Sequence, residues 1–490
     1  MDDGARSDTR NDGGASATGS HGPESDTREA GRTPLYIVAA RLPVDHDAVE
    51  GWRRSPGGLV SALEPTLSEA TAWFGEGRAG QPSPPARIGR CDLIELPMSA
   101  GDRELAHDGF CNRTLWPALH GVSGNIEEQP SWWEAWRRRN ADVAETVART
   151  AAHGAAVWVH DYHHFGLAAP LRRLRPDLRV GLSCHTPIVT QVLAGLTHAR
   201  ELASDLADFA VIGVQTERDR AQLVRWLDHA RIPVTRRPDV ITNPVGLDVD
   251  AWVARRRDAV VVALADRHRA PSGVLVAGVD RVDYTKGLLH KLHAVEVLLA
   301  RGQVGSNDVR FVQIAVPSRT SIPLYGYLRR QMEEAAERIN ADFPRDDGRP
   351  VVTLIQEQLA PRQVAGLMRA ADIALVTPAR DGMNLVALEF AVFNGDRRCE
   401  LILSRGTGAA DHIGRWCRLV DGTDVNGIVD AITGSIAACG TSESADRARC
   451  RAAAASALTT EQWSRTFLEH LLAAGRDASS DRMADRLVGS

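Results

Sequence analysis

The stretch DIALVTPARDGMNLVALEF, residues 372–390, decides the class of fold. It begins with a short apolar run, which predicts a buried strand, and passes through a polar loop that contains an Asp-Gly pair. It ends in an apolar helical pattern, and another helical segment, VAGLMRA at residues 364–370, precedes the strand. A helix, a strand, a loop and a second helix in this order are typical of a parallel sheet with helices on both faces.

The same alternation recurs along most of the chain. Residues 143–160 predict a helix followed by a strand, and 209–216 and 274–280 predict further strands. We therefore expect an α/β protein with two doubly wound, Rossmann-like domains that face a cleft. The expected divisions are a polar, disordered tail at 1–33, an N-terminal Rossmann-like domain at 34–255, a C-terminal Rossmann-like domain at 256–460, and a C-terminal helix and tail at 461–490. We expect that helix to pack back on the N-terminal domain.

The composition indicates which binding partners and which cellular compartment to expect. The chain has 490 residues and a net charge of -5, so it lacks the basic excess of a nucleic-acid-binding protein. No apolar run reaches the roughly 18 residues that span a bilayer, and the N-terminus lacks the apolar core of a signal peptide. The seven cysteines are scattered, without CxxC pairs, which favours free thiols in a reducing cytoplasm. We expect a cytoplasmic protein without membrane or nucleic-acid partners.

Ionisable and amide side chains follow five of the predicted strands, where a ligand crevice is expected. Any one of them could be ordinary loop solvation, but five together favour a site. In chain order they are His160, Asp161, His163 and His164; His185; Arg281, Asp283 and Lys286; Arg319; and Asp381 and Asn384. The histidine spacing is a weak metal signal without a motif such as HExxH, so no metal is expected, and His160 and His164 are expected to be mainly structural.

Some of these groups suit a diphosphate. Arg281 and Lys286 could stabilise the negative charge of a departing diphosphate. The helix predicted after the Asp-Gly loop offers backbone N–H groups at Asn384 and Leu385 for phosphate. Glu389 lies four residues after Leu385, on the same helix face, and could accept hydrogen bonds from a ribose diol. The alternative is that Asp381 merely caps the helix and Glu389 is a surface acid.

Nine motifs in this order and spacing resemble the trehalose-6-phosphate synthase family of retaining glycosyltransferases. They are ARLP (40–43), SPGGL (55–59), LWPALH (115–120), VWVHDYH (157–163), VQTERDR (214–220), NPVGLD (243–248), DRVDYTKGL (280–288), PSR (317–319) and RDGMNLVALEF (380–390). The resemblance implies a two-Rossmann (GT-B) fold and glucose transfer from UDP- or GDP-glucose with retention. It makes 34–255 the acceptor domain and 256–460 the nucleotide-sugar-binding domain. It implies no metal or cofactor, and it leaves a homo-oligomer open. Retention in this family is explained by front-side attack, in which the leaving phosphate oxygen helps to take the acceptor proton.

The resemblance also implies a role for each matching residue. The donor residues would be Gly57 and Gly58 over the phosphate, Arg281 and Lys286 on the diphosphate, Asp381, Gly382, Met383, Asn384 and Leu385 on the sugar and phosphate, and Glu389 on the ribose. The acceptor residues would be Arg41 and Arg319 on the acceptor phosphate, together with Trp116. Asp161 and His185 would hold the donor sugar and the acceptor, and they would form the catalytic set with Arg281, Lys286 and Asp381.

The acceptor side departs from the family pattern. Glu76 stands where an acceptor-contacting tryptophan is expected, His107 where a tyrosine is expected, and the usual HIPFP is HTPIV, residues 185–189. An added acid favours cationic groups, so we expect a phosphorylated or amine-bearing sugar or cyclitol acceptor, such as an aminocyclitol of a specialised or antibiotic pathway. The alternatives are an ordinary trehalose-6-phosphate synthase in which neighbouring residues compensate, a pseudo-glycosyltransferase that forms a C–N bond, and a non-catalytic regulator that binds nucleotide sugars.

Overall fold

The computed structural model describes residues 33–47, 51–55, 57–77, 82–269 and 273–488, with side chains described up to residue 474. The described residues from Pro34 onward form one compact unit. The prediction of a disordered tail at 1–33 lies outside the described residues, apart from Thr33.

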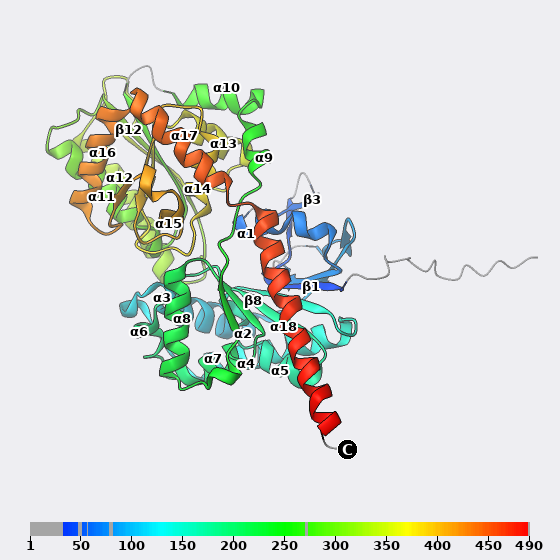
Figure 1. The fold of residues 1–490 in the computed structure, drawn as a ribbon. Coiled ribbons are helices and arrows are strands. Elements are labelled where there is room, and N and C mark those ends of the chain that lie inside the picture. Colours follow the sequence, from blue (N-terminus) through cyan, green and yellow to red (C-terminus); the bar gives the residue numbers. More distant parts are fainter. Residues whose placement is uncertain (1–32, 48–50, 56, 78–81, 270–272, 489–490) are drawn as a thin grey trace, which may run out of the picture. The chain divides into compact units, whose positions relative to one another are not determined.

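An eight-stranded sheet, here called the first sheet, organises the first half of the chain (Figure 1). Its order is β10-β9-β8-β7-β1-β4-β6-β5, and all neighbours are parallel except β5 and β6. The strands are β1 (Leu35–Arg41), β4 (Ala72–Glu76), β5 (Arg87–Ile88), β6 (Cys91–Glu95), β7 (Ala156–His160), β8 (Arg179–Ser183), β9 (Val211–Val214) and β10 (Asp239–Thr242). A separate antiparallel hairpin consists of β2 (Val44–Asp47) and β3 (Gly51–Arg54).

Both faces of the first sheet are buried. Ile37 and Val38 are adjacent in β1 and point to opposite faces, because side chains alternate along a strand. Ile37 belongs to a core with Trp158, and Val38 to a second core with Trp136. The helices before β10 are α1 (Gly58–Leu63), η1 (Pro65–Ser68), α2 (Ala100–Asp102), the π-helical η2 (Arg103–Leu115), α3 (Trp116–His120), η3 (Ser123–Asn125), α4 (Pro130–Thr150), η4 (Tyr162–His164), α5 (Ala168–Leu174), α6 (Thr190–Leu193), α7 (Ala199–Leu206), α8 (Glu217–His229) and η5 (Val234–Arg236).

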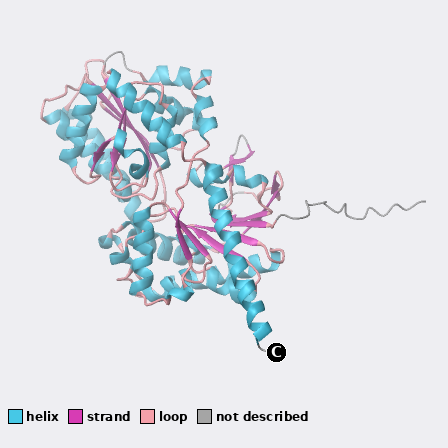
Figure 2. Ribbon diagram, in the orientation of Figure 1, coloured by secondary structure: helices cyan, strands magenta, loops and turns pink. Residues whose placement is uncertain are grey.

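A six-stranded, fully parallel sheet, the second sheet, organises the later half (Figure 2). Its order is β13-β12-β11-β14-β15-β16, with β11 (Val274–Arg281), β12 (Val309–Val316), β13 (Val352–Ile355), β14 (Ile373–Val376), β15 (Glu400–Ser404) and β16 (Arg418–Val420). The helices that accompany it are α9 (Val249–Arg255), α10 (Ala259–His268), η6 (Tyr284–Lys286), α11 (Leu288–Ala300), α12 (Pro323–Asp342), α13 (Pro361–Ala370), α14 (Leu385–Phe393), α15 (Ala409–Ile413), η7 (Gly414–Trp416), α16 (Val425–Ala438) and α17 (Ser442–Ser456). The predicted α/β class with two doubly wound sheets is confirmed.

Two segments join the halves. Trp252 of α9 packs edge-on against Phe393 of α14, with ring centroids 5.6 Å apart. The last helix, α18 (Thr460–Val488), runs along β8 of the first sheet (Figure 1). There the Phe467 ring stacks on Trp158 at 4.8 Å. The domain limits at 255/256 and 460/461 remain predictions.

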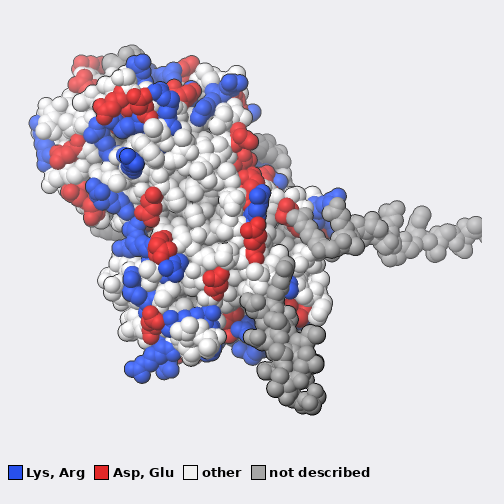
Figure 3. Space-filling view, viewed as in Figure 1, with Lys and Arg blue, Asp and Glu red and all other residues white. Residues whose placement is uncertain are grey.

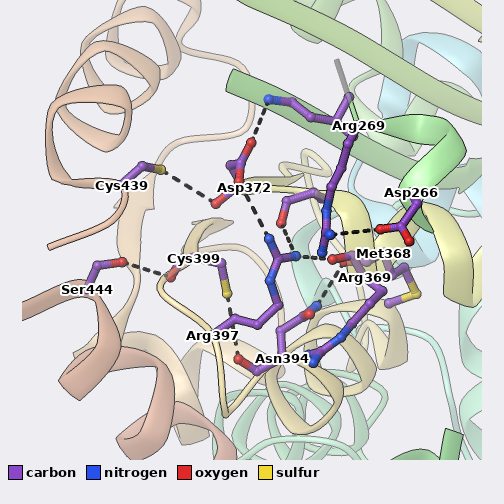
Figure 4. A network of polar contacts seen from close by, with 12 residues as sticks. Asp266, Arg269, Met368, Arg369, Asp372, Asn394, Arg397, Cys399, Cys439 and Ser444 are labelled. Carbon is purple, nitrogen blue, oxygen red and sulfur yellow. Dashed lines mark hydrogen bonds and ion pairs between the residues drawn. The ribbon is translucent and has the colours of Figure 1, made fainter. Parts of the chain in front are cut away.

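A polar network fixes the far end of α14 (Figure 4). Asn394 Nδ2 donates to Met368 O at 2.9 Å, and Arg397 Nη1 donates to Ala371 O at 3.0 Å. These contacts satisfy carbonyls at the C-terminus of α13, which have no partner inside the helix. On the other side, Ser444 Oγ of α17 donates to Cys399 O at 3.3 Å. The network therefore ties α14 to α13 and α17, and it holds the helix that starts at the Asp-Gly loop.

The distribution of charged side chains on the surface and the state of the cysteines agree with what the composition indicates. Basic and acidic side chains are interspersed on the face that Figure 3 shows. All seven cysteines are free thiols, as predicted. Among the helices that the structure describes, none combines the length and apolarity needed to cross a membrane.

Candidate active site

The loop of residues 380–384 forms the centre of the candidate site. α14 begins at Leu385, and Asn384 caps it: its backbone is left-handed, with φ 69°, and its Oδ1 accepts from Ala387 N at 3.2 Å. Asn384, not Asp381, is therefore the capping residue, so the alternative role of Asp381 as the cap is wrong.

Two glycines bring neighbouring loops against this one. A Cβ on Gly382 would lie 2.0 Å from His185 O, so only glycine allows the loop to pack on the segment after β8. A Cβ on Gly58 would lie 2.6 Å from Leu385 Cδ1, so the start of α1, which Gly57 precedes, reaches the first turn of α14. Three of the predicted donor segments thus lie in contact, and Met383 is buried among them.

Lys286 and Asp381 form an ion pair in this region. Lys286 Nζ lies 2.5 Å from Asp381 Oδ2, which also accepts from Asn384 Nδ2 at 3.0 Å. Burial would raise the pKa of Asp381, but the Lys286 ammonium outweighs it and holds that pKa below its usual value. Asp381 is therefore anionic at neutral pH, and it neutralises Lys286 until another anion competes for the ammonium.

Asp161 and His185 lie together at the ends of β7 and β8. An Asp161 oxygen accepts from His185 N at 3.2 Å. Burial raises the pKa of Asp161 to about 6, although hydrogen bonds from backbone N–H groups oppose it. Burial also lowers the pKa of His185 to about 4, so its imidazole is neutral at pH 7 and acts through hydrogen bonds. His160 Nδ1 shares a hydrogen bond of 3.2 Å with His185 Nε2, and so supports that ring from behind.

The histidines do not form a cluster with other metal-binding side chains. Within the described parts of the chain, no group of three or more His, Cys, Asp or Glu side chains is placed to hold a metal ion.

The Trp116 ring lies close to two of the predicted arginines. The Arg319 guanidinium carbon is 4.0 Å from the centre of the Trp116 ring, and that of Arg281 is 5.6 Å from it. Arg319 also donates to Asn112 Oδ1 at 2.7 Å and Asp283 Oδ2 at 2.6 Å. This group therefore joins side chains from helices beside the first sheet with side chains at strand ends of the second sheet.

Two of the residues that depart from the family pattern, Glu76 and His107, form a second group around Arg41 and Arg103. Glu76 is buried, and its Oε1 lies 3.5 Å from Arg139 Nη2. Burial raises the pKa of Glu76 to about 6, and the charges of Arg139, Arg103 and Arg41 oppose this rise. Arg41 is the strand neighbour of Glu76, because the two Cα atoms are paired between β1 and β4.

His107 belongs to the same group and carries no charge. Burial, together with nearby arginines such as Arg41, lowers the pKa of His107 to about 3. Its ring stacks on that of His163, with centroids 5.4 Å apart.

Two predicted residues are less engaged. Glu389 is half-buried and makes no hydrogen bond or ion pair within the described chain. Burial raises its pKa to about 7, against the charge of Arg255. Gly57 is exposed. The ribose and phosphate roles of these residues remain predictions.

Sequence reasoning missed Arg139. It lies in the run Arg137–Arg139 of α4, and such a run usually marks a solvated face. A signal was nevertheless present: Arg139 is spaced three residues after Trp136 and four before Val143, which places it on the apolar face of the helix.

Two doubly wound sheets, with cations and a helix N-terminus at their strand ends, agree with the GT-B glycosyltransferase fold that the sequence motifs imply. The model of glycosyltransferase family 20 matches residues 33–473. The chain belongs to that family. The trehalose-6-phosphate synthase of Mycobacterium avium (strain 104) is 34% identical over 491 aligned residues, which cover 93% of this chain and 98% of that protein.

Solved structures that are similar to this chain have names that agree with this family. The α,α-trehalose-phosphate synthase (UDP-forming) of Burkholderia vietnamiensis is 28% identical, with a TM-score of 0.82 over 90% of this chain and 98% of that one. The corresponding UDP-forming enzyme of Burkholderia xenovorans, solved in complex with glucose-6-phosphate, is also 28% identical, with a TM-score of 0.79 over 89% of this chain and 100% of that one.

Proposed function

We propose that this protein transfers glucose from UDP-glucose to glucose 6-phosphate, with retention, and so forms α,α-trehalose 6-phosphate. The observation that carries the proposal is the pairing of Glu76 with Arg139. The Glu76 carboxylate is the strongest argument from the sequence for an unusual acceptor, and the Arg139 guanidinium beside it already offsets its negative charge. The named activity of the relatives supports the same acceptor and a uridine nucleotide.

On the donor side, Arg281 and Lys286 would bind the diphosphate. The diphosphate would take over the Lys286 ammonium from Asp381, which would then be free to accept hydrogen bonds from the sugar. Leu385 N, at the start of α14, would add a backbone donor and the positive end of the helix dipole. Glu389 would hold the ribose.

On the acceptor side, Arg41 and Arg319 would bind the 6-phosphate, and Trp116 would contact the sugar. Asp161 and the neutral His185 would orient sugar hydroxyls between donor and acceptor. The acceptor oxygen attacks the anomeric carbon from the face that the diphosphate leaves. The C1–O bond to phosphate breaks, the new C1–O bond forms, and the acceptor proton passes to the departing phosphate oxygen, which releases UDP. Arg281 and Lys286 stabilise the charge that develops on UDP.

A second candidate acceptor is an amine-bearing sugar phosphate or aminocyclitol. The Glu76 carboxylate favours it, because an ammonium group beside a buried acid forms a strong, charge-assisted hydrogen bond. The named activities of the relatives favour glucose 6-phosphate. The C–N bond-forming and regulatory alternatives gain no support from the site.

The test is product formation with defined substrate pairs. Purified protein would be incubated with UDP-glucose or GDP-glucose, and with glucose 6-phosphate, glucosamine 6-phosphate or glucose. We expect UDP-glucose and glucose 6-phosphate to give the highest kcat/KM, with an α,α linkage by NMR. A preference of tenfold or more for glucosamine 6-phosphate would favour the second candidate, and no turnover with any pair would overturn the proposal.

A further inference from the structure

The side chain of Asp283 is a fully buried carboxylate surrounded by donors. It is 0% exposed. Its Oδ2 accepts from Arg319 Nη1 at 2.6 Å. Its Oδ1 accepts from Trp116 Nε1 at 3.4 Å, and from Thr285 N and Thr285 Oγ1 at 3.0 Å each. Both oxygens are therefore satisfied, although the proposed reaction gives Asp283 no role.

The donors around Asp283 come from distant parts of the chain. Trp116 begins α3, beside the first sheet, and Arg319 follows β12 of the second sheet. Thr285 lies in η6, the turn that also carries Lys286. One carboxylate thus connects two proposed acceptor residues with the turn that presents a proposed diphosphate cation.

Arg319 depends on such support. Its backbone is left-handed, with φ 48°, which is uncommon for a residue with a side chain. Its guanidinium is largely buried, and a buried charge is stable only when it is paired and hydrogen-bonded. Burial would raise the pKa of Asp283, but the charges of Arg319 and Arg281 outweigh it and hold that pKa below its usual value. The partner therefore stays anionic.

We propose that Asp283 is a positioning residue for the phosphorylated acceptor, and that it acts by holding the Arg319 guanidinium against the Trp116 ring. The inference rests on the proposed function. Without Asp283, the guanidinium would lose its only carboxylate partner among the described residues, and it would sample orientations that do not match a phosphate.

A neighbouring carboxylate provides a matched control. Asp280 also belongs to the end of β11, is 8% exposed, and forms an ion pair of 2.6 Å with the buried Lys291. Gln313 Nε2 donates to the same carboxylate at 3.0 Å. None of these partners is a proposed substrate-binding residue, so Asp280 represents a buried ion pair with a structural role only.

The first test compares Asp283→Asn with Asp280→Asn. An amide at position 283 would direct N–H groups at donors, so contacts to Arg319 or to Trp116 would break. We expect the KM for glucose 6-phosphate to rise roughly 10- to 100-fold, the effect of one lost charged hydrogen bond, with a rise of less than about threefold in the KM for UDP-glucose. Asp280→Asn should lower the Tm and leave both KM values within about twofold. Equal effects of Asp283→Asn on both KM values, or none on either, would overturn the inference.

A double-mutant cycle tests whether Asp283 acts through Arg319. Arg319→Gln alone should raise the KM for glucose 6-phosphate strongly. If Asp283 positions that side chain, Asp283→Asn combined with Arg319→Gln should be no worse than Arg319→Gln alone. Additive effects would overturn the inference. The double variant removes both charges, so it can be measured even where Asp283→Asn leaves an unpaired buried cation and does not fold. A wild-type protein inactive with UDP-glucose and glucose 6-phosphate would instead overturn the proposed function.

Discussion

The Lys286 ammonium lies 2.5 Å from the Asp381 carboxylate, so the proposed diphosphate cation pairs with a proposed sugar-binding acid. The two side chains are 11% and 14% exposed, which keeps the pair largely shielded from water. If Lys286 binds the diphosphate and Asp381 binds the sugar, as proposed, donor binding exchanges this contact for two new ones. Sugar and diphosphate are therefore expected to bind as a unit.

Lys286→Ala tests the charge in this pair. The variant removes a cation aimed at the leaving group, so kcat should fall by about 100-fold or more. Steady-state assays with UDP-glucose and glucose 6-phosphate measure the effect. The control is Arg338→Ala, which removes an exposed cation paired with Glu296 on another surface and should leave kcat unchanged. Unaltered turnover in Lys286→Ala would refute its assigned role.

Gly382→Ala tests the contact between two loops. The added methyl group would meet His185 O at 2.0 Å, so the loop before α14 must move away from the segment after β8. We expect a loss of at least tenfold in kcat/KM and a lower Tm. Gly124→Ala is the control, because a Cβ there meets no atom within 4 Å. If Gly382→Ala matched Gly124→Ala in both measurements, the proposed packing of the site would be wrong.

Arg139→Met tests whether Arg139 offsets the negative charge of Glu76. The Arg139 charge lowers the pKa of Glu76, so without the guanidinium that pKa should rise further and the acid should be protonated near neutral pH. Above the raised pKa the carboxylate would repel an anionic acceptor, so the KM for glucose 6-phosphate should rise about tenfold at alkaline pH. Adding Glu76→Gln to Arg139→Met removes the repulsion and should restore most of the lost affinity. A double variant as impaired as Arg139→Met would show that Arg139 acts by another route.

Glu76 also predicts a pH dependence of stability. Its folded-state pKa of about 6 lies above the ordinary value of 4.5, so the folded state binds the proton more tightly than the unfolded state. Its contribution is fully present below pH 4.5 and is lost as the pH rises through 6. Compared with the wild type, Glu76→Gln should gain about 2 kcal/mol in the free energy of unfolding between pH 4.5 and pH 7. Urea unfolding at both pH values measures this difference, and a constant difference would contradict the raised pKa.

The sequence predicted the sheets well, because a strand buried on both faces appears as a short, continuous apolar run. Strands such as Val211–Val214 and Ile373–Val376 are of this kind. The same apolar runs also showed which polar residues follow the strands. Because the carboxyl ends of parallel strands meet at one edge of a sheet, these residues were expected to lie along that edge. Pairings across long sequence separations could not be predicted. Asn112 reaches Arg319 from the π-helix Arg103–Leu115, whose irregular hydrogen bonding leaves no periodic signal.

The packing of α18 on the first sheet has a consequence for biosynthesis. Trp463, Phe467 and Leu471 of this helix are at most 2% exposed, and they complete one core of that sheet. Strands that leave the ribosome early thus lack part of their apolar cover until the last helix has been translated. The nascent sheet therefore exposes apolar surface throughout the synthesis of the second half, and such surface is prone to aggregation.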